Sequence, residues 1–252
     1  MKKLSLFFLA LLAFGPMVWA QDWIEVSDAN GLNNAITNGT YIRLTADITL
    51  SAHLTIPAEK TITINLGGHT LRRNLSSATE MGCVIIVAAS GNLTLTGGTL
   101  SGGWNSGYYN DGIHSAGGIV NKGSTTLNNV TITNCKGIDG GAIMNVSDAT
   151  LNITGGTISN CESNQGGGGI VNKGYSATII GCTFDNNTAT TRGGAIWSDH
   201  SISTGGCTFT NNKALAQGQG GDGGAIHVDG GLTILVDDII RATVPKMPVA
   251  FM

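Results

Sequence analysis

Paired carboxylates are the first chemistry to look for, because glycoside cleavage uses one carboxyl group as an acid and a second at a set separation. Two motifs supply them, Asp111-Gly112-Ile113-His114 and Asp237-Asp238. The repeats described below place these motifs roughly five or six coils apart, so their side chains cannot converge. Asp139 and Asp222 precede glycine bends, where solvated turn residues are usual. The sequence therefore predicts no catalytic residues and a non-enzymatic protein.

Aromatic residues gather in one segment that interrupts the repeats. Residues 103–114 contain Trp104, Tyr108 and Tyr109. Aromatic rings on a protruding loop offer a large contact area at low entropic cost, and they stack on sugars or on partner side chains. The alternative is that the rings fold back onto the protein. On the first interpretation, this segment is a candidate binding site for a glycan or a protein.

Five cysteines would suggest disulfides in an exported chain. Cys135 and Cys161 share one phase of the repeat, Cys182 and Cys207 share another, and Cys83 has no phase partner. Parallel Cβ directions on stacked strands make the disulfide torsion awkward, so free, stacked thiols are favoured. The spacing gives no zinc motif, and the Asp-Gly-Gly stretches lack the nine-residue period of calcium repeats. We therefore expect no metal and no cofactor.

One short motif returns five times and organises the chain. Two small residues, another Gly or Ala, and an Ile recur every 24 to 30 residues, and the isoleucines are Ile119, Ile143, Ile170, Ile196 and Ile226. A second motif with the same period places apolar residues at Leu100, Ile132, Ile158, Phe184 and Phe209. A repeat of about 25 residues cannot fold alone. We expect the repeats to stack as coils of short parallel strands, so that equivalent residues form columns of the core.

Asparagines also recur at equivalent positions, and we expect their side-chain amides to bond from coil to coil. One set follows the second motif and the other follows the repeated Ile: Asn134, Asn160, Asn186 and Asn211, and Asn121, Asn145 and Asn172.

A row of residues stands one position after each repeated Ile. If side chains alternate, the row points outward as an apolar stripe, and such stripes usually mark contact surfaces. The alternative is that loops cover the row. Its members are Val120, Met144, Val171, Trp197 and His227. We take Trp197 and His227, with the three aromatic residues of segment 103–114, as candidate ligand-binding residues.

The motifs resemble a known family of repeats. Gly-Gly-Ala-Ile alternates with Phe184-Asp185-Asn186-Asn187 and Phe209-Thr210-Asn211-Asn212, which is similar to the polymorphic outer membrane protein repeats of bacterial surface proteins. The resemblance covers about residues 90–235, although Ile132 and Ile158 replace the Phe. It implies a right-handed parallel β-helix of the pectin-lyase-like class, which includes many polysaccharide lyases and hydrolases. Lyases of this class use acids with an Arg or Lys base, but no acidic cluster falls in phase with Arg192.

The N-terminal residues predict export. Residues 1–20 combine Lys2 and Lys3, an apolar run and a small-residue cleavage site at Ala20, as in a secretory signal peptide. The run is shorter than a membrane span needs, so we expect no span after cleavage. Residues 21–40 should form an N-terminal cap with a short helix over 27–36, whose Leu32, Ala35 and Ile36 cover the first coil.

The β-helix should occupy residues 41–240 and end in an irregular tail, 241–252, that contains two prolines. In the last coil we expect Leu232, Ile234, Val236 and Ile239 to point inward. The tail is either an irregular cap or a sign that the chain is truncated, and the uncovered last coil favours truncation.

Composition excludes some partners. Only 12% of residues are charged and the net charge is −3, so nothing attracts nucleic acid or an anionic membrane. The sequence thus predicts an all-β, right-handed parallel β-helix with a short N-terminal capping helix. We expect an exported, secreted or cell-surface, adhesin-like protein that binds a glycan or protein through its outer faces. The alternatives are a carbohydrate-active enzyme, either a polysaccharide lyase or a glycoside hydrolase, and a structural passenger fragment of a larger surface protein.

Overall fold

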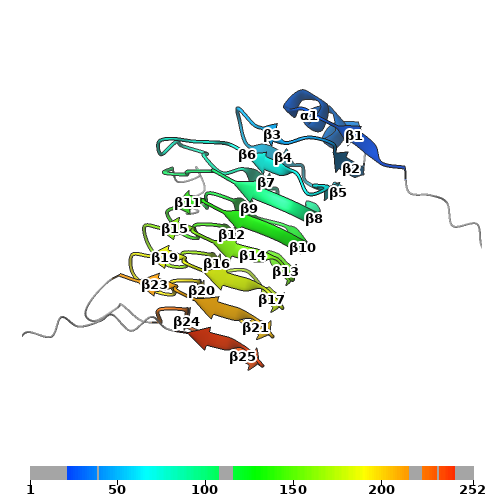
Figure 1. Ribbon diagram of the computed structural model, residues 1–252. Helices are drawn as coiled ribbons and strands as arrows, with labels where there is room; N and C mark the ends of the chain where they lie inside the picture. The colour runs from blue at the N-terminus through cyan, green and yellow to red at the C-terminus, as the bar shows by residue number, and fades with distance from the viewer. Residues whose placement is uncertain (1–21, 39, 108–115, 216–222, 232, 242–252) are drawn as a thin grey trace, which may run out of the picture.

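The computed structural model describes residues 22–38, 40–107, 116–215, 223–231 and 233–241. In these ranges the chain is a stack of coils built from parallel strands, with one helix at its N-terminal end (Figure 1). The expected all-β parallel β-helix with a capping helix is confirmed. The signal peptide, Tyr108, Tyr109, Asp111, His114 and Asp222 lie outside the described residues, as does tail segment 242–252.

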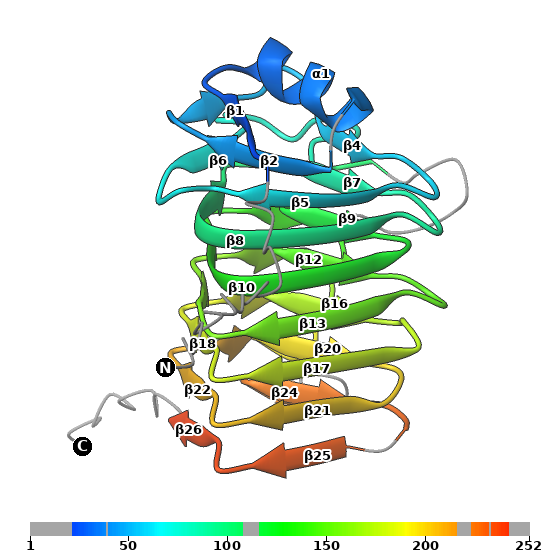
Figure 2. The same cartoon turned by 90° about the vertical axis from the view of Figure 1, so that its right-hand side faces the viewer.

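The described strands form three parallel sheets along the stack (Figures 1 and 2). The main path of the first sheet is β1(Ile24–Val26), β2(Tyr41–Leu44), β5(Thr61–Asn65), β8(Asn92–Ser101), β10(Ser124–Thr133), β13(Thr150–Thr154), β17(Ser176–Ile180), β21(Ile202–Gly205) and β25(Thr233–Val236). Its branch contains β3(Ile48–Thr49), β6(Thr70–Arg72), β14(Thr157–Ser159), β18(Thr183–Asp185), β22(Thr208–Thr210) and β26(Ile239–Arg241).

The other two sheets complete each coil. The second sheet contains β4(Leu54–Ile56), β7(Ile85–Val87), β9(Ile119–Asn121), β12(Ile143–Asn145), β16(Ile170–Asn172), β20(Ile196–Ser198) and β24(Ile226–Val228). The third contains β11(Lys136–Gly137), β15(Glu162–Ser163), β19(Thr188–Ala189) and β23(Lys213–Ala214).

The repeated isoleucines line up in one column, as predicted. Along β9, β12, β16, β20 and β24, each Ile is the register partner of the next. The second column is also in register, and it ends in Phe184 and Phe209, whose rings stack with centroids 4.8 Å apart. Residues at equivalent positions of the repeat therefore lie over one another along the core.

A short helix closes the N-terminal end, as expected. Helix α1 spans Ala29–Asn38, and Asp28 Oδ1 accepts a hydrogen bond of 2.8 Å from the Gly31 backbone N–H. This is an N-cap that satisfies a free helix donor. Leu32, Ala35 and Ile36 are buried against the core. The helix thus shields the first coil from solvent.

One asparagine ladder is confirmed in full. Asn121 Nδ2 donates to Asn145 Oδ1 over 2.6 Å, Asn145 Nδ2 donates to Asn172 Oδ1 over 2.8 Å, and Asn172 Nδ2 donates to Ser198 Oγ over 2.9 Å. All four residues are buried. Their amides therefore satisfy one another inside the protein.

The second asparagine row is mainly a row of turns. Asn134, Asn160, Asn186 and Asn211 have φ angles of 54, 53, 54 and 56°, a left-handed conformation that Asn tolerates better than most residues. Asn186 donates to Asn160 Oδ1 over 2.7 Å, whereas Asn211 donates to Asp185 Oδ1 over 2.9 Å. The expected amide ladder is therefore found only in part.

All five cysteines are buried and none of them forms a disulfide, as favoured by the sequence. Burial raises the pKa of Cys182 to about 12 and the pKa of Cys161 well above its ordinary value. A hydrogen bond from Cys161 lowers the pKa of Cys135. The thiols are part of the packed core.

The last coil corrects one prediction. Ile202 and Thr204 point inward on β21, and their register partners on β25 are Thr233 and Leu235. Likewise, Ile240 is the partner of the core residue Phe209. The inward assignment of Val236 and Ile239 was wrong by one residue, because the connection between β24 and β25 is one residue longer than that between β20 and β21. Along the backbone, Ile234 is the register partner of Ser203. Leu232 lies outside the described residues.

Candidate recognition site

The fold brings together two of the five predicted site residues. Trp197 lies at the centre of β20 and His227 at the centre of β24, and the two are register partners on adjacent coils. Both are partly buried. Because parallel pairing places equivalent residues about 4.8 Å apart, the side chains of Trp197 and His227 lie side by side on the outer face of the second sheet.

Asp229, which the sequence analysis did not select, joins these two residues. Its Oδ2 accepts hydrogen bonds from Trp197 Nε1 over 2.7 Å and from Arg192 Nη1 over 2.8 Å. Its Oδ1 lies 2.8 Å from His227 Nε2, which donates in the protonation state that carries a hydrogen there. The Asp229 side chain nevertheless remains 38% exposed. We call these four residues the Asp229 cluster.

The electrostatics of the cluster keep Asp229 ionised. Partial burial acts to raise the pKa of its carboxyl group, but the hydrogen bonds from His227 and Trp197 and the charge of Arg192 outweigh it. The pKa of Asp229 falls to about 2. A carboxylate with several donors is stabilised in its charged form.

The indole of Trp197 is held rigidly. Lys173 Nζ lies 5.0 Å from the centroid of the ring and the Arg192 guanidinium lies 5.2 Å from it, which are cation–π distances. Lys173 also pairs with Asp139 Oδ2 over 3.3 Å, and the Asp139 side chain is fully buried. The backbone at Gly166 packs so closely on the ring that a Cβ there would collide with it. Trp197 is thus a fixed part of the wall.

A second carboxyl group, Asp199, borders the cluster. It follows β20 as Asp229 follows β24, and the two carboxyl groups are close enough to interact electrostatically. Burial and the neighbouring Asp229 raise the pKa of Asp199, while Lys173 and His200 act in the opposite direction. The sequence contained a signal for this pair, because each Asp stands two residues after a member of the predicted outward row. As expected, this acidic pair is not in phase with Arg192, but Asp229 contacts Arg192 from a different position in the repeat.

The predicted exposed stripe is wrong for its first three members. Val120, Met144 and Val171 are buried in a second apolar cluster that includes Ile86, and Trp197 packs against it. The glycine-rich connections between the third and second sheets cover the row. At Gly167, for example, an added Cβ would lie 2.7 Å from Val171 Cγ2, and its φ of 61° favours glycine. These connections leave only Trp197 and His227, at the C-terminal end of the row, partly exposed at the surface.

Trp104 lies elsewhere on the wall. It forms a parallel bridge with Lys136, and Lys136 Nζ lies 5.0 Å from the centroid of its ring. Lys136 also pairs with Glu162 over 2.8 Å. The coil of Trp104 precedes that of Trp197 by three, which is roughly 14 Å along the axis.

The remaining candidates for chemistry have structural roles in the described parts of the chain. Asp238 accepts hydrogen bonds from Thr204 Oγ1 and from the backbone N–H of Cys207. Asp237 is a turn residue with a φ of 53°. Across the described ranges, no three His, Cys, Asp or Glu residues are grouped so as to hold a metal ion. No helix found there is long and apolar enough to cross a membrane.

Comparison with known proteins identifies the repeats. Residues 181–199 and 206–229 match the family model of the Chlamydia polymorphic membrane protein repeat. The matched residues contain β18 to β20, β22 to β24 and all four residues of the Asp229 cluster. The match confirms the resemblance drawn from the motifs, and it indicates a surface or outer-membrane protein. Neither the curated proteins nor the solved structures contain a match.

Proposed function

We propose that the protein is an exported, adhesin-like surface rod that binds a glycan at the Asp229 cluster without chemical change. The observation that carries this proposal is Asp229 itself. Its two oxygens are oriented by groups from two coils, yet the carboxylate stays partly exposed. An ionised acceptor with fixed neighbours is prepared to bind hydroxyl groups with little further loss of entropy.

The chemistry of the surface favours a glycan over a protein partner. Arg192 and Asp229 offer exposed donors and acceptors beside the edge of an indole, which is a usual combination in sites for polar ligands. Protein interfaces commonly have an apolar core. Here the apolar residues of the row, such as Val171, are already buried by the protein's own connections. The long segment 103–114 with Tyr108 and Tyr109 stays a second candidate for contact with the same partner.

Binding of the full chain to an array of immobilised neutral and acidic glycans tests the proposal. We expect Asp229→Asn and Trp197→Phe each to weaken binding at least roughly tenfold, because each removes part of the bonding that orients the carboxylate. Asp148→Asn is the matched control, since Asp148 is exposed in a turn with a φ of 66° that Asn also tolerates. Binding that is unchanged by all three substitutions would refute the assignment of the site.

A hydrolase is the second candidate function, and one observation favours it. Asp199 and Asp229 are adjacent carboxyl groups whose pKa values are shifted in opposite directions. In glycosidases, such a difference in pKa keeps one carboxyl group protonated as the general acid while the second carboxyl group is ionised. Release of reducing ends from a panel of polysaccharides, abolished by Asp199→Asn, would support hydrolysis and overturn the non-enzymatic proposal. Unsaturated ends would instead indicate a lyase.

Export is proposed from residues 1–20 and from the family of the repeats. Expression of the full chain in a bacterium with an outer membrane tests it. We expect N-terminal sequencing of the mature protein to begin near Gln21, and protease added to intact cells to degrade it. A product that retains Met1 and resists protease until the cells are lysed would refute export.

A further inference from the structure

One ion pair differs from the others of the described residues in where its carboxylate lies. Lys173 Nζ is 3.3 Å from Asp139 Oδ2, and the Asp139 side chain is fully buried while that of Lys173 remains 27% exposed. In the other ion pairs of the described ranges, the acidic side chain is 38 to 62% exposed, as in the pair of Lys136 with Glu162. Water therefore solvates those carboxylates, but it does not reach the carboxylate of Asp139.

Backbone hydrogen bonds hold both residues of the pair in place. Asp139 lies in the connection between β11 and β12, and the N–H of the next residue, Gly140, donates to Gly166 O over 3.2 Å. Lys173 directly follows β16, and its N–H donates to Asn145 O over 2.8 Å. Two residues that are 34 positions apart in the sequence are thus fixed on adjacent coils.

The indole of Trp197 covers the amine of Lys173. The centroid of its ring is 5.0 Å from Nζ, and the backbone of Gly166 packs against the same ring. In bulk water an ammonium and a carboxylate persist as ions because both are strongly hydrated. Where burial removes that hydration, uncharged products become more favourable relative to the two ions.

We propose that Lys173 and Asp139 join in an isopeptide bond, a covalent amide between the two side chains. A proton passes from the Lys173 ammonium to the Asp139 carboxylate along their contact, and the Nζ lone pair then attacks Cγ of Asp139. The hydroxyl group of the carboxyl leaves with a second proton from the nitrogen, as water. One C–N bond forms and one C–O bond breaks, nothing is oxidised or reduced, and the net change is the loss of one water molecule.

The geometry suits this reaction at Lys173 and at none of the other ion pairs described above. The distance of 3.3 Å from Nζ to Oδ2 is within the roughly 3–3.5 Å at which bound groups react, and Cγ is bonded directly to Oδ2. Arginine, as in the pair of Arg192 with Asp229, stays protonated and cannot attack in this way. Lys136 is only 2.8 Å from Glu162, but both side chains are exposed, so these two ions stay hydrated.

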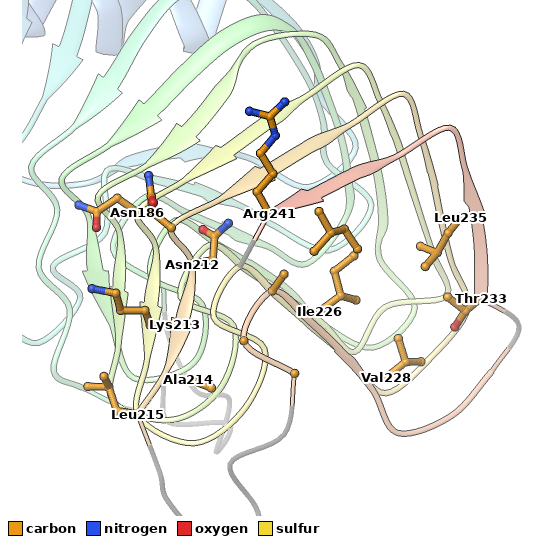
Figure 3. Close-up of a pocket in the computed structure, with 15 residues that line it drawn as sticks. Asn186, Asn212, Lys213, Ala214, Leu215, Ile226, Val228, Thr233, Leu235 and Arg241 are labelled. Carbon is orange, nitrogen blue, oxygen red and sulfur yellow. The ribbon is translucent and has the colours of Figure 1, made fainter. Parts of the chain in front are cut away.

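A bond at this place would strengthen the stack against loss of its last coils. A pocket of about 1130 Å³ lies at the C-terminal end, where core-facing residues such as Ile226 and Leu235 line it (Figure 3). Coils of a repeat protein contact mainly their neighbours, so local unfolding spreads along the stack from an end. A covalent link between the coils of β12 and β16 is expected to stop such unfolding from passing to the N-terminal coils.

The mass of the full chain under denaturing conditions tests the proposal. We expect the mature chain to be lighter by one water molecule than its sequence requires. The Lys173→Arg variant, which keeps the ion pair, should have its full mass. Trypsin should not cleave after Lys173, so residues 137–192 should be recovered as one peptide, and cleavage of this peptide after Glu162 should leave its two parts joined.

Three results would overturn the proposal, and each is measured on the unmodified sequence, so none depends on the folding of a variant. A chain of full mass that trypsin cleaves after Lys173 contains an ordinary ion pair. A chain that lacks one water, but whose two parts separate after cleavage at Glu162, has instead cyclised at Asp139-Gly140 into a succinimide. A second bond at Lys136, detected as a failure of trypsin to cleave there, would show that burial of the carboxylate does not decide which pair reacts.

Discussion

Replacement of Ile196 by Ala tests the central column of the fold. Ile196 is fully buried on β20 between Ile170 and Ile226, its register partners on the adjacent coils. Removing three carbons from such a site loses transfer free energy and leaves a cavity that stacked neighbours cannot readily fill, so we expect a loss of about 3–4 kcal/mol in the free energy of unfolding.

Ile180→Ala is the matched control. Ile180 is at the end of β17, and it points outward with 53% of its surface exposed. The same chemical change should therefore cost less than about 1 kcal/mol. Urea unfolding followed by circular dichroism gives both values, provided that the slope of the transition is compared, because repeat proteins can unfold in parts.

Equal losses in the two variants would refute the assigned direction of the side chains. A small loss in both, with an unchanged slope, would show that the column of isoleucines does not pack as a continuous core. Either result would also undermine the surface assignments, because these follow from the same alternation along each strand.

Three further predictions follow from individual contacts. Asn145→Ala should lower the free energy of unfolding by about 2–3 kcal/mol in urea, since it removes one hydrogen bond from each of two buried amides, Asn121 and Asn172, whereas Asn152→Ala on the exposed face should be nearly neutral. The folded pKa of Asp229, about 2, lies below its ordinary value of 3.8, so its contribution is present above about pH 4 and is lost as the pH falls toward 2. Solvent screening limits this contribution to less than about 1 kcal/mol, and Asp229→Asn should remove that part of the acid dependence of the urea midpoint. Burial raises the pKa of Cys182 to about 12, so a thiol reagent at pH 8 should modify this residue only after unfolding, as peptide mapping would show.

The core columns could be predicted from the sequence because stacking repeats a single environment. Once coils lie over one another, each inward position has the same neighbours in every repeat, and the same residue type recurs there. The register of Ile143 with Ile170, and of Phe184 with Phe209, follows from the motifs alone. The periodic pattern of the sequence therefore predicts which core residues lie over one another on adjacent coils.

Exposure of the outward row could not be predicted in the same way. Alternation gives the side of the strand on which Met144 and Val171 lie, but it says nothing of what packs over that side. The cover is a set of glycine-rich connections whose lack of side chains lets them approach closely, as at Gly166 and Gly167. The glycines that mark the repeat therefore also bury the row that follows it.

The last coil shows how sensitive such predictions are to one added residue. The extra residue between β24 and β25 exchanges the two faces of the strand, so that Leu235 joins the inward column as the partner of Thr204. Ile and Leu residues on both faces of β25 and β26 hide the exchange from a pattern analysis. Only the pairing with Thr204 on β21 resolves it.

The same reasoning explains why the candidate site was found only in part. Asp229 contacts Arg192, which lies 37 residues earlier in the sequence. The two residues occupy different positions within their repeats, so a search for residues at equivalent positions does not pair them. What the sequence does show is a break in the row, from aliphatic residues to Trp197 and His227. Inside a stack, a change of residue type disturbs two neighbouring coils, whereas on the outside it is tolerated. A change of type in an outer column is therefore where a repeat protein of this kind can acquire a binding site, and a change in an inner column, as at Thr233, marks where its regular core ends.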